Sequence, residues 1–158
     1  KNIEIKQKVG LLSIDIDGND YWILNAIDLE KFKPAIIICE YNSLFGFDKC
    51  ITIPYSENFN RGAEGVEKIY YGASIKAITE LAFKKGYYLI GSNNAGNNLF
   101  FVEEKYKDRF KILTEKEAYV RAKFRENVNL SYQDCLALLE KKIFYDVNLK
   151  KLVKFNND

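Results

Sequence analysis

Acidic and amide side chains follow two neighbouring apolar runs near the start of this chain. The first run, Leu11 to Ile16, ends in Asp15, Asp17 and Asp20, with Gly18 between the last two. The second run, Ala35 to Cys39, is followed at once by Glu40, Tyr41 and Asn42. Such residues at the ends of neighbouring strands are placed where open α/β sheets bind ligands and carry out chemistry.

Three interpretations compete for these residues: two chemical ones, for Asp17, Glu40 and Asn42, and one structural. Carboxylate and amide oxygens are the ligands of a hard cation such as Mg²⁺, which would orient a substrate hydroxyl. Alternatively, Asp17 or Glu40 is a general base whose pKa is raised by burial beside another carboxylate. The structural alternative is that Asp17 and Asp20 cap the following helix and that Asp15 pairs with a missing segment.

The surrounding pattern predicts how these groups are brought together. We expect a buried strand over residues 9–17, a helix over 19–30 and a second buried strand over 35–40. This order is typical of a right-handed crossover between parallel strands, so the two strand ends lie side by side. Asp17, Glu40 and Asn42 are then expected to converge on one spot.

The remaining elements are predicted from periodicity and turn residues. A long aperiodic loop covers 43–70, a helix covers 71–85, and strands 87–91 and 98–103 form an antiparallel hairpin. Thr114 with Glu117, and Ser131 with Asp134, are capping-box patterns that open helices over 114–126 and 131–143. The Lys- and Asn-rich tail from about residue 146 is expected to fray.

Composition limits the classes of function. The 158 residues are 47% hydrophobic, with a net charge of +2 and no histidine. A packed domain is expected, and every mechanism that needs a histidine within this chain is excluded. No apolar stretch suits a membrane span, and the near-neutral charge leads us to expect no nucleic-acid partner. Three widely spaced cysteines indicate reduced thiols and a cytoplasmic location.

Several short blocks in order resemble the carboxyl-terminal part of FkbM-like domains, which are class I S-adenosylmethionine-dependent methyltransferases. The blocks are LLSIDIDGNDYWIL, IIICEYN, TIPY, YYGASIKAITELAFKKGYYLIGSN and NAGNNLFFV, which together span residues 11–102. The resemblance implies an α/β fold with a Rossmann-like half-sheet: parallel strands, a terminal antiparallel hairpin, and helices on both faces. We expect this domain to cover residues 1–106, and a helical extension over 107–158 to pack against it.

The resemblance also implies an activity and a cofactor. S-adenosylmethionine would donate a methyl group to an oxygen or nitrogen of a small molecule, with a sugar as one candidate. Asp17 and Glu40 are the expected catalytic residues, and Tyr41, Asn42 and Tyr71 are expected to contact the substrate. The glycine-rich G-x-G turn that holds the cofactor in that family does not occur in this sequence, so no residue is assigned to cofactor binding.

The strand over 9–17 reads as an inner strand with almost nothing before it. We therefore expect its free edge to pair with a missing amino-terminal half or with another subunit. The alternative to an enzyme is a binding or assembly module that kept this half of the fold and has no catalytic activity. A third reading, an enzyme acting on a nucleotide or phosphate, is disfavoured because no Gly-rich phosphate loop is present.

Overall fold

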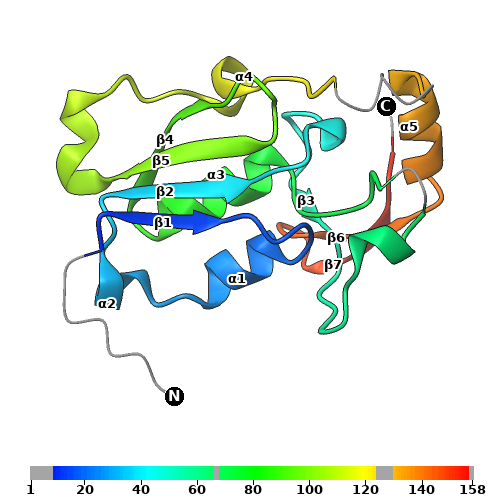
Figure 1. Cartoon of the computed structure of the whole chain (residues 1–158), viewed down its shortest axis with the longest axis horizontal. Coiled ribbons are helices and arrows are strands. Elements are labelled where there is room, and N and C mark those ends of the chain that lie inside the picture. The colour runs from blue at the N-terminus through cyan, green and yellow to red at the C-terminus, as the bar shows by residue number, and fades with distance from the viewer. Residues whose placement is uncertain (1–8, 66–67, 124–129, 157–158) are drawn as a thin grey trace.

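The computed structural model describes residues 9–65, 68–123 and 130–156, and it is an α/β structure with two sheets (Figure 1). The larger sheet has the order β1-β2-β5-β4. Its strands are β1 (Leu11–Ile14), β2 (Ile36–Glu40), β4 (Tyr87–Ser92) and β5 (Asn98–Glu103). The smaller sheet has the order β3-β6-β7, from β3 (Ile51–Thr52), β6 (Ile143–Asp146) and β7 (Lys151–Lys154).

The predicted parallel pair and hairpin are both present in the larger sheet. β1 runs parallel to β2, with Leu11 opposite Ile36 and Ile14 opposite Cys39. β4 and β5 form the predicted antiparallel hairpin, and β5 also pairs antiparallel with β2. The carboxyl ends of β1 and β2 therefore lie next to each other, on the side of the sheet that faces β3, β6 and β7 in Figure 1.

β1 differs from the predicted strand in length and in burial. The strand is four residues long rather than nine, and Asp15 to Asp17 already belong to the following turn. Within the described residues β1 pairs only with β2, so it is an edge strand. Leu11 is 54% exposed, and Ile14 alone among the strand's residues is buried. The expectation of a strand covered on both faces is therefore wrong for the structure as described.

The helix predicted over 19–30 is two helices, α1 (Asp20–Ala26) and α2 (Leu29–Phe32). Ile27 is extended, with a ψ of 129°, and this breaks the helix. Asp28 then accepts hydrogen bonds from the amides of Glu30 and Lys31 and so begins a new helix. An aspartate that binds amides two and three residues ahead is a strong local start signal, which a periodicity argument overlooks.

α3 (Ile75–Lys84) begins later than predicted, because the residues just before it form backbone contacts with β3 and the residue that follows β3. Ser74 caps the helix by accepting from the amide of Ala77, 3.2 Å away. Gly72 accepts a hydrogen bond from Ile53, and Ala73 forms a bridge with Thr52. The chain leaves the helix through Gly86, whose φ of 81° suits a residue without a side chain.

The helix predicted over 114–126 is only α4 (Glu115–Ala118), although its capping box between Thr114 and Glu117 is present. The backbone beyond it is engaged elsewhere. The Tyr41 hydroxyl donates to the carbonyl of Val120 at 2.8 Å and accepts from its amide at 3.2 Å, and Ser43 accepts from the amide of Ala122. These tertiary hydrogen bonds replace helical ones, and the last part of the predicted helix lies outside the described residues.

The carboxyl-terminal segment contains strands that the sequence did not indicate. α5 (Tyr132–Leu139) has the predicted Ser131–Asp134 capping box but ends early, because Ile143 opens β6. β6 pairs with β3 from the long loop, and β7 pairs with β6. The prediction of a fraying tail is therefore wrong, and so is the prediction of an extension that is only helical.

Two hydrophobic cores hold the sheets and helices together. The first lies around the larger sheet and includes Leu24, Ile37, Ile78 and Phe101. The second joins residues of the 43–70 loop to α5 and the smaller sheet, and its rings include Phe45 and Phe144 with centroids 5.0 Å apart. The long loop and the carboxyl-terminal segment thus depend on each other for burial, while the division between residues 106 and 107 stays a prediction.

Within the described ranges, no helix is both long enough and apolar enough to cross a lipid bilayer. Cys39, Cys50 and Cys135 are all free and buried.

Candidate active site

The turn after β1 is built around Asp20. Its carboxylate accepts hydrogen bonds from the amides of Ile16 and Gly18, each at 2.9 Å, and its side chain is fully buried. Burial raises the pKa of Asp20, against the lowering effect of those amides. Asp20 therefore shapes the turn and is not a helix cap. Asn19 stands at the cap position without capping, and its amide donates to the carbonyl of Ser56.

The same turn presents Asp17 at the surface. Its φ of 58° is left-handed, a conformation that aspartate tolerates better than most residues. The side chain is 62% exposed and is bound by Arg61. Asp15, also exposed, accepts a hydrogen bond from the Asn98 side chain at 3.3 Å.

Glu40, at the end of β2, is the buried member of the group. It is 3% exposed, and its Oε2 atom has no hydrogen-bond partner. Burial, followed by the charges of Asp20 and Asp15, raises the pKa of Glu40 to about 8. The carboxyl group is therefore largely protonated at neutral pH and changes charge just above it.

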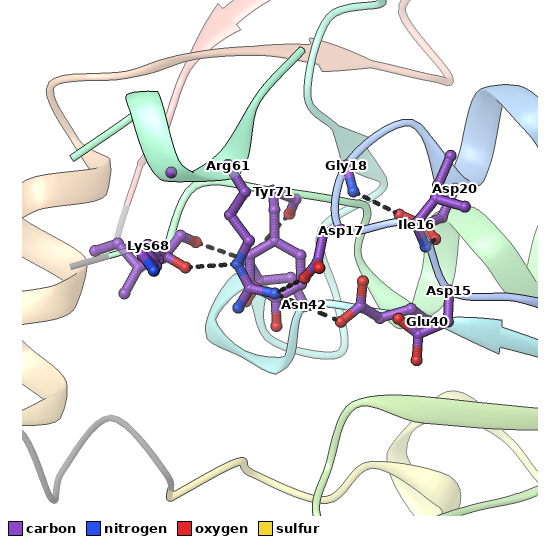
Figure 2. A network of polar contacts seen from close by, with 12 residues as sticks. Asp15, Ile16, Asp17, Gly18, Asp20, Glu40, Asn42, Arg61, Lys68 and Tyr71 are labelled. Carbon is purple, nitrogen blue, oxygen red and sulfur yellow. Dashed lines mark hydrogen bonds and ion pairs between the residues drawn. The ribbon is translucent and has the colours of Figure 1, made fainter. Parts of the chain in front are cut away.

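Arg61 joins Asp17 to Glu40, and sequence reasoning did not find it. It lies in the 3₁₀ helix η2 (Arg61–Ala63), within the long loop. Its Nη1 atom binds Asp17 and lies 3.8 Å from Oε1 of Glu40 (Figure 2). Its guanidinium carbon lies 3.5 Å from the centre of the Tyr71 ring. The only available signal was an arginine in a loop expected to be functional, because Asp17 lies 44 residues away.

Tyr41 and Asn42, predicted to contact substrate, are buried and bonded to the protein's own backbone. Tyr41 is completely buried and binds Val120 as described above. Asn42 donates to the carbonyls of Ile69 and Tyr71, at 2.8 and 3.1 Å, and accepts from the amide of Leu44. Both side chains hold loops in place, so the structure brings neither of them to the surface beside Asp17.

Tyr71 lies beside the site but faces inward. It is 2% exposed, and its ring supports the guanidinium of Arg61. In Figure 2 its ring stands next to Asp17 and Arg61, while Asp20 lies on the other side of the turn. Tyr71 therefore contributes to the site by supporting the side chain of Arg61.

The geometry does not suit the expected Mg²⁺ ion. The guanidinium of Arg61 lies between Asp17 and Glu40, at the point where a cation would bind both. The oxygen of Asn42, the third expected ligand, already accepts from Leu44. No cluster of three or more histidine, cysteine or acidic residues in the described part of the chain could hold a metal. We therefore derive no step through a metal.

A match to a family model identifies the family. Residues 1–87 match the model of the methyltransferase FkbM domain, which is more than half of the chain. The chain belongs to this family. No curated protein and no solved structure matches it.

Family membership makes methyl transfer the chemistry to be expected of an FkbM domain, and a methyl donor is needed for it. The glycine turn after β1 leaves no room for such a donor close to its backbone. Gly18 follows β1, but the space above its Cα is filled, because an added Cβ would lie 2.3 Å from the Phe59 ring. The site that the structure does build, from Asp17, Glu40 and Arg61, is one that could bind and deprotonate a methyl acceptor.

Proposed function

We propose that this chain supplies the acceptor side of an S-adenosylmethionine-dependent methyltransferase that acts on a hydroxyl or amine of a small molecule. The observation that carries the proposal is the Asp17–Arg61–Glu40 group in a chain of the FkbM family. It lies at the carboxyl ends of adjacent parallel strands, where α/β proteins bind ligands. The donor's own binding residues stay unassigned.

The two carboxylates suit different parts of the acceptor's chemistry. Asp17 is exposed and can accept a hydrogen bond from the acceptor's O–H or N–H. Glu40 is buried and has a pKa of about 8, so the minority that is ionised near neutral pH is a strong base and this fraction grows as the pH rises toward 8. The proton leaves the acceptor as the methyl group arrives, and Asp17 or Glu40 receives it. The rest of catalysis is the positioning of the acceptor for in-line attack at the methyl group.

A sugar hydroxyl is the acceptor class to test first. The test uses the product of the complete open reading frame that encodes this chain. S-adenosylmethionine with a labelled methyl group is offered together with a panel of simple sugars and amines, and label is measured in the small-molecule fraction. We expect transfer, and we expect Glu40→Gln to reduce it by about 10²-fold or more, the usual worth of a general base. The matched control is Glu57→Gln, which replaces an exposed glutamate in the 43–70 loop that also contains Arg61.

Calorimetry with S-adenosylmethionine separates this proposal from its alternative. Heat of binding together with transfer supports the enzyme. If the same product shows neither heat nor transfer, a non-catalytic binding or assembly module is favoured, and the enzyme proposal fails.

We further propose that the free edge of β1 pairs with another strand, from an amino-terminal half of the domain or from another subunit. Leu11 in β1 is 54% exposed and Ile16 in the turn after it is 51% exposed, and open apolar edges favour pairing. Amide hydrogen exchange in the complete product tests the proposal. Slow exchange of the β1 amides that do not bond to β2 supports pairing, and rapid exchange contradicts it.

A further inference from the structure

Arg61 reaches the carboxylates from a distant part of the chain and is fixed at several points. Its Nε atom donates to the carbonyl of Lys68 at 2.9 Å, and its Nη1 atom binds Asp17. The same Nη1 atom lies 3.8 Å from Glu40, and the Tyr71 ring supports the guanidinium at 3.5 Å. A hydrogen bond to the backbone, two carboxylates and one ring face thus define the position of a single side chain.

This arrangement depends on the shape of the guanidinium as well as on its charge. A planar fork can donate in separate directions while its face rests on an aromatic ring. The ammonium group of a lysine is a point charge and cannot make all of these contacts together. The Arg61 side chain is only 14% exposed, so its charge acts on Glu40 with less screening than at an open surface.

The surroundings of Glu40 show why this cation matters. Three carboxylates act on its charge: Asp20, Asp15 and Asp17. Among the described groups that act on it, Arg61 is the one cation, and it opposes the other three. Without Arg61, both the proximity of Asp17 to Glu40 and any ionisation of Glu40 would be opposed by like-charge repulsion.

We propose that Arg61 is the positioning residue of this site, whose guanidinium holds the carboxyl groups of Asp17 and Glu40 together at the ends of β1 and β2. This inference rests on the proposed function for its biological meaning, although its physical content can be measured without any substrate. Arg61 acts through the two carboxylates and is not itself a catalytic residue.

The test is a carbon-13 NMR titration of the glutamate side chains in this chain, with the Glu40 signal assigned by its loss in Glu40→Gln. Arg61→Gln removes the charge while keeping a polar side chain that is two bonds shorter, and we expect it to raise the pKa of Glu40 by about one unit or more. Arg61→Lys keeps the charge but loses the fork, and we expect a smaller rise. Arg109→Gln is the matched control: this arginine packs on the Tyr106 ring, away from the site, and its loss should leave Glu40 unchanged.

An unchanged titration of Glu40 in folded Arg61→Gln overturns the inference. Should that variant fail to fold, Arg61→Lys decides in the same way, since an unchanged Glu40 there shows that the fork is not needed. The outcome is separable from the proposed function. If the titration shifts as expected but Glu40→Gln still transfers methyl groups normally, the general-base proposal fails and the role of Arg61 in positioning stands.

Discussion

Glu40 should make the stability of this protein fall as the pH rises toward 8, and replacing it with glutamine should remove that dependence. The group is buried and its pKa is raised from 4.5 to about 8, so the folded state binds a proton more tightly than the unfolded state does. Because the pKa of Glu40 is higher in the folded state, protonation of this group stabilises the folded protein. This stabilisation is fully present below pH 4.5 and is lost as the pH rises through 8. Glutamine imitates the protonated carboxyl group and does not titrate.

The size of this pH effect follows from the linkage between proton binding and folding. Between pH 6 and pH 8 the folded state changes from almost fully protonated at Glu40 to about half protonated, while the unfolded state stays ionised. The free energy of unfolding should therefore fall by about 2 kcal/mol over this interval. The chain has no histidine, so few other groups titrate there and the effect is easily isolated.

Urea unfolding at pH 6 and pH 8 measures this difference in the wild type, in Glu40→Gln and in the control Glu57→Gln. The wild type and the control should each lose about 2 kcal/mol more than Glu40→Gln does. If all three proteins show the same pH dependence, Glu40 does not titrate in this range. The reasoning about its burial and its role as a base would then be refuted.

Three further changes test how the site and its supports are built, each by urea unfolding. Gly18→Ala should cost about 1–3 kcal/mol, because the new methyl group meets the Phe59 ring, and Phe59→Leu in the same chain should recover part of it. Ser74→Ala should cost about 1–2 kcal/mol, since its hydroxyl accepts from the amides of Ile51 and Ala77; no loss would show that the cap is unimportant. Phe144→Ala should cost about 3–5 kcal/mol, and a smaller loss would mean that the second core contributes little.

Local signals in the sequence determined much of the larger sheet and the location of the site. The β-branched run Ile36 to Ile38 and the turn residues around Gly96 are enough to predict β2 and the β4–β5 hairpin, because they act on neighbouring residues. The alternation of strand and helix predicts that Asp17 and Glu40 follow adjacent parallel strands, as they do. Both capping boxes are also present where they were predicted.

Tertiary contacts decided where the helices and strands of the folded chain begin and end. α4 ends at Ala118 because Tyr41 and Ser43, almost eighty residues earlier, take the backbone groups that a longer helix would have used. The pattern around residue 146 is polar and reads as a tail. It forms β6 and β7 because the long loop supplies β3 as a partner and Phe45 as a core neighbour.

The same division between local signals and tertiary contacts applies to the chemistry of the site. Residue types and strand order alone place carboxylates at one sheet edge, because the period of a strand and the hand of a crossover are local properties of the chain. They cannot reveal that the cation between those carboxylates is the guanidinium of Arg61 and not a metal ion. A contact between residues 17 and 61 depends on how the loop folds back over the sheet, and such a contact leaves no periodic trace in the sequence.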